Sequence, residues 1–209
     1  MAQTPARESA MNLACIVEGH GEREAAPILL RRIAAQIDPQ LVVNITATLR
    51  VPKSRLLKAG GIERTVDLAA RTLNGPGAVF VLLDGDEACP AELGPALLQR
   101  ARQSRSDIPI AVVIAQCEFE AWFLTAITSL RDQRGLSNAA EPPLEPESIR
   151  DAKGWLTERM TSGHYSETRD QPAFAAQFDL HLARRADSFD KCYRDLARLL
   201  TSPPEFFHG

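Results

Sequence analysis

The stretch "AVFVLLDGDEACP", residues 78–90, decides the fold because it joins a continuous apolar run to a cluster of acids. Residues 78–83 contain no polar side chain, which is typical of a strand buried on both faces of a parallel sheet. Asp84, Asp86 and Glu87 follow at once. Carboxylates this close raise each other's pKa unless water, a helix N-terminus or a cation faces them. The stretch therefore predicts a buried strand whose carboxyl end carries acids.

The same alternation of apolar runs and amphipathic stretches extends on both sides of this strand. Strands are expected at residues 13–17, 41–49, 78–84 and 108–115, and helices at residues 22–37, 62–73, 93–103 and 119–130. Repeated strand–helix–strand units imply right-handed crossovers. The sequence thus predicts an α/β fold in which a parallel sheet of about four strands is flanked by helices.

The remainder of the chain has a different character. Residues 133–147, "QRGLSNAAEPPLEPE", carry three prolines and little periodicity, so a linker or surface loop is expected there. The predicted domains are a disordered N-terminus at 1–10, the α/β domain at 11–132, this loop, a helical appendage packed on the same domain at 148–202, and a tail at 203–209. Ser188 is the expected N-cap of the last helix.

Composition restricts the class of protein. The formal net charge of -3 gives no global reason to expect nucleic acid, so any such binding must be local or carried by metal. The four cysteines are far apart in the sequence and form no metal-ligand spacing, and the N-terminus lacks the apolar stretch of a signal peptide. No segment approaches the roughly 20 apolar residues of a membrane span. A cytoplasmic protein that does not cross a membrane is therefore expected.

Acids follow three of the predicted strands. Glu18 ends the first strand, Asp84 and Asp86 end the third, and Glu118 and Glu120 follow the fourth. Ligands of open α/β sheets bind outside the carboxyl ends of the strands. Hard oxygen ligands gathered there suit Mg²⁺ or Mn²⁺, so the sequence predicts a metal site at this edge.

Each acid also has a structural interpretation. An Asp-Gly pair after a strand is commonly a turn, and Asp86 can cap the next helix. Glu118 and Glu120 fall in the first turn of a predicted helix, where acids interact favourably with the helix dipole. Glu18 has no comparable structural reason to follow five apolar residues.

Two other motifs lie near the same edge of the predicted sheet. The stretch "EGHGERE" (18–24) is not a dinucleotide-binding loop, because the third glycine would fall at Glu24 and acids would face the pyrophosphate. The basic stretch "RVPKSRLLK" (50–58) is either a phosphate contact, through Lys53 and Arg55, or a solvated loop.

Together, "VEGHGE" at 17–22 and "LLDGD" at 82–86 resemble the Toprim domain, the Mg²⁺-dependent phosphoryl-transfer fold of topoisomerases, bacterial primases, recombination proteins and the overcoming-lysogenization-defect nucleases. More narrowly, "IVEGHGEREAAPILLRRI", "EFEAWFLTA" and "DAKGWL" are similar to a family of bacterial Toprim-like proteins often encoded beside ABC-type ATPases, in settings suggestive of phage defence. The resemblance covers roughly residues 11–200.

The resemblance implies a role for each matching residue. Glu18 would be the general acid/base or a metal ligand, Glu22 a second catalytic acid, and Lys153 a late lysine that stabilises charge. The metal ligands would be Asp84 and Asp86, completed by Glu120 or Glu118. The chain departs from the Toprim pattern after Asp86, where "EACP" replaces a further acid and glycine, and this departure puts a second metal position in doubt.

The function expected from this set is a nuclease that uses Mg²⁺ or Mn²⁺ to hydrolyse phosphodiester bonds in DNA or RNA, as effector of a defence system with an ABC- or AAA-type ATPase partner. Two alternatives stay open: a non-catalytic regulatory subunit of such an ATPase, and a phosphohydrolase of small nucleotides. The oligomeric state also stays open, a homo-oligomer included.

Overall fold

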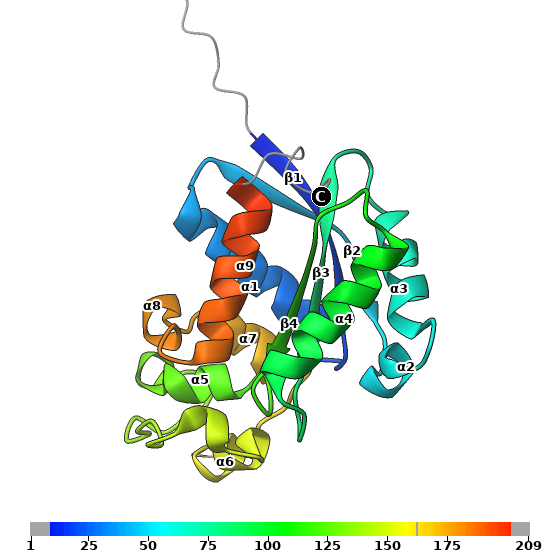
Figure 1. The fold of residues 1–209 in the computed structure, drawn as a ribbon. Helices are drawn as coiled ribbons and strands as arrows, with labels where there is room; N and C mark the ends of the chain where they lie inside the picture. The colour runs from blue at the N-terminus through cyan, green and yellow to red at the C-terminus, as the bar shows by residue number, and fades with distance from the viewer. Residues whose placement is uncertain (1–8, 162, 202–209) are drawn as a thin grey trace, which may run out of the picture.

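A four-stranded parallel sheet forms the centre of the molecule (Figure 1). The computed structural model describes residues 9–161 and 163–201. The strands are β1 (Ser9–Val17), β2 (Leu41–Arg50), β3 (Gly77–Asp84) and β4 (Ile110–Ala115), in the order β2-β1-β3-β4. All neighbouring strands are parallel. The predicted α/β class, with helices flanking a parallel sheet, is confirmed.

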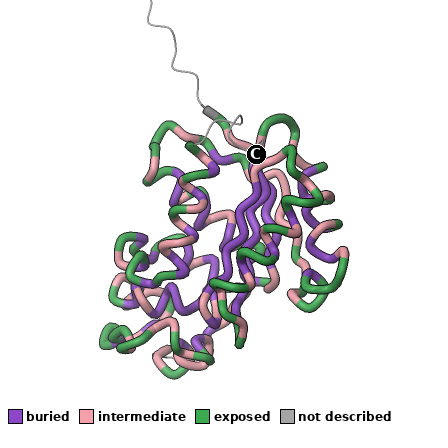
Figure 2. Tube along the Cα trace, in the orientation of Figure 1, coloured by how far each residue is buried: buried purple, intermediate pink, exposed green. Residues whose placement is uncertain are grey.

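Alternate side chains of β1, β3 and β4 enter two separate cores, one on each face of the sheet. On one face, Leu13, Phe80 and Val113 pack with the helix α1 (Glu22–Ile37) and with the C-terminal helices. On the other, neighbouring residues of the same strands pack with α2 (Lys53–Leu57), α3 (Gly61–Ala70) and α4 (Pro90–Ser104). Figure 2 shows the buried central strands between the two helical layers. Burial on both faces explains the continuous apolar runs at residues 13–17, 78–83 and 110–115 of β1, β3 and β4.

In the described part of the chain, the C-terminal half is a set of four short helices and a longer last one that share the first core. They are α5 (Ala121–Thr125), α6 (Ala152–Glu158), α7 (Asp170–Ala175), α8 (Leu180–Ala183) and α9 (Asp187–Thr201), with 3₁₀ turns at Ile127–Leu130 and Pro146–Ser148. A chain of edge-to-face aromatic contacts links them, for example Phe123 with Phe178 and Phe178 with Phe189. This half and the sheet therefore bury one continuous apolar surface.

The structure corrects several local expectations. The strand β1 begins at Ser9, so residues 9 and 10 are not disordered, and residues 1–8 and 202–209 lie outside the described part of the chain. The helix expected at 119–130 is instead α5 followed by a 3₁₀ turn. The Ser129 hydroxyl bonds the Ala126 carbonyl at 2.6 Å and accepts from the Asp179 amide at 2.9 Å, which favours the tighter turn.

Ser188 is not the N-cap of the last helix, because α9 begins one residue earlier. The carboxylate of Glu147 accepts instead from the amides of Asp187 and Ser188, at 2.8 and 3.1 Å. The Ser188 hydroxyl accepts from the indole of Trp122 at 2.8 Å. A distant glutamate thus takes the capping role and frees the serine to fix the tryptophan.

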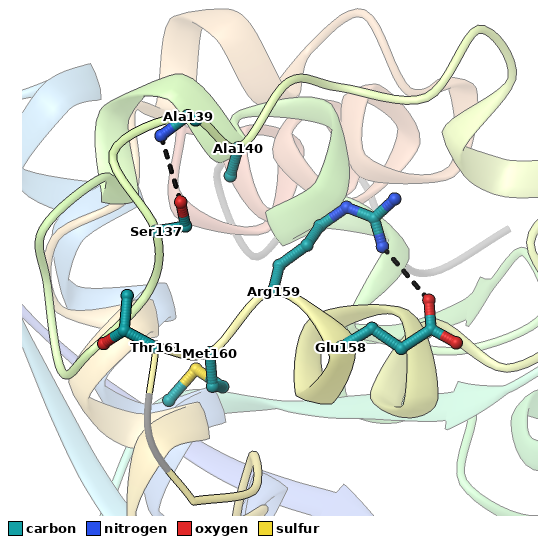
Figure 3. A pocket seen from close by; sticks show the side chains of 7 residues that line it. All are labelled: Ser137, Ala139, Ala140, Glu158, Arg159, Met160 and Thr161. Carbon is teal, nitrogen blue, oxygen red and sulfur yellow. Dashed lines mark hydrogen bonds and ion pairs between the residues drawn. The ribbon is translucent and has the colours of Figure 1, made fainter.

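The proline-rich segment is fastened to the end of α6. Leu136 forms an antiparallel bridge with Met160, the Ser137 amide donates to the Arg159 carbonyl at 2.9 Å, and the Thr161 amide donates to the Gly135 carbonyl at 2.7 Å. Figure 3 shows the small pocket that forms between these two stretches. The segment is a loop held in place by backbone hydrogen bonds.

None of the helices in residues 9–161 and 163–201 has both the length and the apolar character that a bilayer crossing needs.

Candidate functional site

The candidate site lies where the strand order reverses, between β1 and β3. The chain leaves β1 toward β2 on one side, whereas β3 and β4 lie on the other. Val17 pairs with Leu82 in register, so Glu18 and Asp84 leave the sheet at the same edge. Crevices at such reversal points are the usual ligand sites of open α/β sheets.

Glu22 closes the turn between β1 and α1. Its Oε2 accepts from the amides of Glu18 and Gly19, at 3.0 and 2.8 Å, and its side chain is buried. Burial raises the pKa of Glu22, although the two amide hydrogen bonds oppose the shift. Gly21 is required in this turn because a Cβ there would overlap the Glu167 carbonyl and the Gln171 side chain. The glycines of "EGHGE" therefore serve close packing rather than a phosphate loop.

Asp84 ties the end of β3 to the loop after β4. Its Oδ1 accepts from the Phe119 amide at 2.8 Å, and the residue is buried. Burial raises the pKa of Asp84 well above its usual value, and the neighbouring charges of Glu22 and Glu120 raise it further. The three acids therefore interact electrostatically.

Glu120 is completely buried. Its Oε1 accepts from the Tyr165 hydroxyl at 3.0 Å and from the Gln171 side-chain amide at 3.1 Å. Burial raises the pKa of Glu120 to about 7, against the opposing effect of the Lys153 ammonium. A carboxyl of this kind exchanges its proton near neutral pH.

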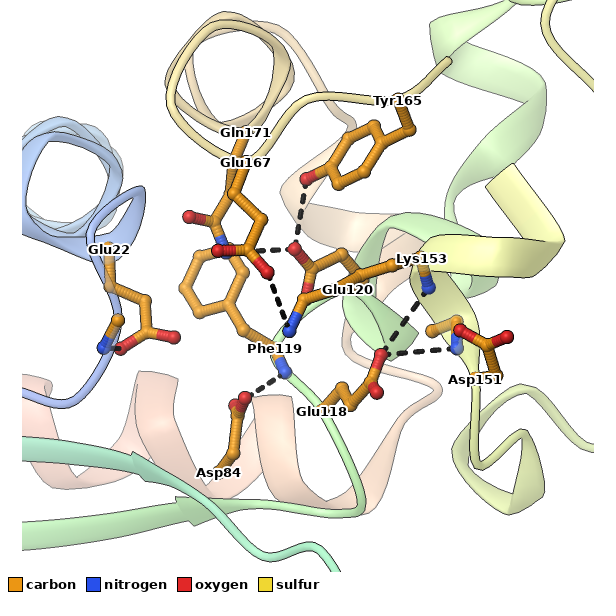
Figure 4. A network of polar contacts seen from close by, with 12 residues as sticks. Glu22, Asp84, Glu118, Phe119, Glu120, Asp151, Lys153, Tyr165, Glu167 and Gln171 are labelled. Atoms are coloured by element: carbon orange, nitrogen blue, oxygen red, sulfur yellow. Dashed lines mark hydrogen bonds and ion pairs between the residues drawn. The ribbon is translucent and has the colours of Figure 1, made fainter. Parts of the chain in front are cut away.

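Lys153 is the cation that faces these acids (Figure 4). Its Nζ lies 3.0 Å from Glu167 Oε1 and 4.0 Å from Glu120 Oε2. Burial alone would lower its pKa, but the charges of Glu120 and Asp84 outweigh that effect and raise it. Glu118 accepts from the amides of Ala152 and Lys153, at 3.1 and 3.4 Å, and so positions the helix that carries the lysine.

Each buried acid uses one oxygen to hold the fold and leaves the other available. Glu22 is bonded through Oε2, Asp84 through Oδ1 and Glu120 through Oε1. Among the described residues, no donor bonds the second oxygen of any of the three, and Glu120 Oε2 and Glu18 Oε2 are buried without a partner. The site therefore presents uncommitted carboxylate oxygens, which are the donors that Mg²⁺ and Mn²⁺ bind.

The remaining predicted residues are placed less centrally. Asp86 is exposed, has a left-handed backbone with φ of +50°, and forms an ion pair with the ammonium of Lys53. The same ammonium donates to the carbonyls of Asp84 and Gly85, at 2.9 and 3.2 Å, while the Lys53 amide donates to Glu18 Oε1 at 3.2 Å. Asp86 and Lys53 therefore neutralise each other beside the buried acids, and Arg55, on α2, forms no side-chain hydrogen bond or ion pair with an acid among the described residues.

The acids do not close around a single point. Within residues 9–161 and 163–201, no three His, Cys, Asp or Glu side chains are placed so that together they could hold a metal ion. The donor chemistry fits a hard divalent cation, but the side chains of the site would need to rotate toward one another to bind it.

Sequence reasoning missed the residues that support the site. Tyr165, Glu167 and Gln171 belong to a stretch with no helical periodicity, and they contact Glu120 or Lys153 across separations of 14 to 51 residues. The only local signal was composition, since polar side chains cluster around the short helix α7.

Fold and site together define an open α/β protein with a cluster of acids, the acidic cluster, at the reversal point of its sheet. The chain belongs to the family described as Domain of unknown function (DUF4276), whose model matches residues 17–197. Comparison with curated proteins and with solved structures found no match.

Proposed function

We propose that this protein is a Toprim-like hydrolase of phosphodiester bonds in nucleic acid, dependent on Mg²⁺ or Mn²⁺. One observation carries the proposal: Glu22, Asp84, Glu120 and Lys153 lie close enough at the strand ends for their charges to shift the pKa of Asp84, and each acid has one oxygen that accepts no hydrogen bond among the described residues. Buried acids in excess of cations are costly to ionise. A divalent cation would supply the missing positive charge.

The roles of the residues follow from their surroundings. Asp84, Glu22 and Glu120 would hold the ion, which would neutralise charge on the scissile phosphate and lower the pKa of a bound water. Glu18, whose Oε2 has no partner, would accept the proton of the attacking water. The Lys153 ammonium would stabilise negative charge on the phosphate, while Tyr165 and Gln171 hold Glu120 in position.

The test is cleavage of end-labelled DNA and RNA with Mn²⁺, Mg²⁺ or EDTA. Asp84→Asn and Glu18→Gln are expected to reduce metal-dependent cleavage at least about 100-fold, whereas Glu158→Gln, an exposed glutamate on α6, serves as the matched control. Undiminished cleavage by both site variants would overturn the assignment. Cleavage of mononucleotides but not of oligonucleotides would instead identify a small-nucleotide phosphohydrolase.

A second candidate is a non-catalytic subunit that binds an ABC- or AAA-type ATPase in the cytoplasm. The observation that favours it is the spread of the acids, which do not close around an ion as they stand. Titration calorimetry distinguishes the two functions: Mn²⁺ binding that Asp84→Asn abolishes supports the hydrolase, and absence of Mn²⁺ binding to the folded wild type supports the second candidate.

A further inference from the structure

An open hollow beside the edge strand β2 is lined by arginines from four different elements. They are Arg23 of α1, Arg50 of β2, Arg55 of α2 and Arg64 of α3. The hollow has a volume of about 500 Å³. No acidic side chain is among the residues that line it, so the hollow is a concentrated patch of positive charge on a chain whose net charge is negative.

The side chains of these four arginines make no hydrogen bond or ion pair with any other residue in the described ranges. Several arginines elsewhere are paired with acids: Arg100 binds Glu63 at 2.8 Å and Arg105 binds Asp107 at 2.7 Å. Unpaired guanidinium groups that share one hollow repel one another. An anion bound between them would remove this repulsion, and the planar guanidinium forms paired hydrogen bonds with phosphate oxygens.

Residues of the hollow neighbour the acidic cluster in sequence and in strand pairing. Arg23 directly follows Glu22 at the start of α1. Arg50 pairs in register with Val17, the residue before Glu18. Lys53, three residues after Arg50, donates its amide to Glu18. The hollow and the acids therefore lie beside each other at the carboxyl ends of β1 and β2.

We propose that the arginine hollow binds the phosphate backbone of a polynucleotide strand and directs the strand toward the acidic cluster. Cleavage of the bound strand rests on the proposed function, whereas binding of the strand does not. Phosphates of a strand repeat along its length, so one part of the strand can occupy the hollow while another reaches the acids. A mononucleotide cannot place one phosphate group in the hollow and another at the acids. The hollow thus selects strands over single nucleotides.

The test is fluorescence anisotropy of a labelled single-stranded oligonucleotide in EDTA, where no metal-dependent cleavage occurs. Arg50→Ala/Arg55→Ala removes two of the proposed contacts. Arg102→Ala/Arg185→Ala removes the same charge at two exposed arginines that do not line the hollow. Each phosphate contact on a single strand contributes about 0.7 to the slope of log affinity against log salt, so the first variant should lose about 1.4 in slope and about 10- to 25-fold in affinity at ~0.1 M salt.

The control variant should bind within about twofold of wild type, because its arginines are not contacts. Arg23→Ala/Arg64→Ala provides a second pair from different elements and should show a similar loss. Wild-type affinity and slope in both hollow variants would overturn the proposal. Arginine-dependent binding of labelled polyglutamate without binding of the oligonucleotide would also overturn it, and would identify an acidic protein as the ligand.

Binding and cleavage fail separately in this design. Arginine-dependent binding by a protein that cleaves nothing supports the hollow and contradicts the hydrolase. Metal-dependent cleavage by a protein whose oligonucleotide binding does not depend on the arginines supports the hydrolase and contradicts the hollow.

Discussion

Replacing Glu120 with glutamine should stabilise the metal-free protein at alkaline pH while removing hydrolysis. Glu120 is fully buried and its pKa is raised to about 7 from the value of 4.5 that it has when exposed. Between these two values the folded state holds a proton that the unfolded state has released, so the folded state is favoured at low pH and loses this advantage as pH rises through about 7. Glutamine keeps an oxygen for Tyr165 and Gln171 but never ionises.

The size of the effect follows from the shift. Between about pH 5.5 and about pH 8, wild type should lose about 2 kcal/mol of stability that Glu120→Gln retains. For a chain of this length that corresponds to roughly 4 to 8 °C in melting temperature. Thermal unfolding by circular dichroism in EDTA at both pH values measures the difference, with Glu158→Gln, an exposed carboxyl, as control. If the melting temperatures of wild type and Glu120→Gln changed equally between the two pH values, the reasoning that ionisation of Glu120 destabilises the folded state would be refuted.

Three further outcomes follow from the same contacts. Mn²⁺ should raise the melting temperature of wild type, by the equivalent of about 2.7 kcal/mol at 100 times its dissociation constant, but should leave Asp84→Asn unchanged; an equal rise in both would exclude Asp84 as a ligand. Lys153→Met should destabilise the metal-free protein by at least about 2 kcal/mol near neutral pH in urea unfolding, since the acids lose their cation, and a stabilised variant would contradict this. Gly21→Ala should cost about 1 to 3 kcal/mol because its Cβ overlaps the Glu167 carbonyl, whereas Gly163→Ala, which meets no atom within 4 Å but has φ of +77°, reports backbone strain alone.

The sheet could be predicted because burial on both faces leaves a direct trace in the sequence. The runs that end at Val17, Asp84 and Ala115 are apolar throughout, and the acids after them stand out for that reason. The helices α7 and α8 could not be predicted, because six and four residues are too few to show a period.

The predicted convergence of Glu18 and Asp84 on one edge required only that β1 and β3 be neighbours, as they are. Which of the acids are buried and which are exposed could not be predicted. Only Gly85 separates Asp86 from the buried Asp84. Asp86 is nevertheless exposed and pairs with Lys53, and its backbone is left-handed. The burial of Glu120 depends on Tyr165, which lies 45 residues further along the chain.

The double use of the buried acids has a consequence for reading other members of the family. Through one oxygen each, Glu22 fastens the β1–α1 turn and Asp84 ties the end of β3 to the loop after β4, whatever the other oxygen does. A family member without catalytic activity would still need Glu22 and Asp84 for these contacts. Both acids therefore serve the fold whether or not the protein is an enzyme, and their presence in a related sequence does not by itself identify a hydrolase.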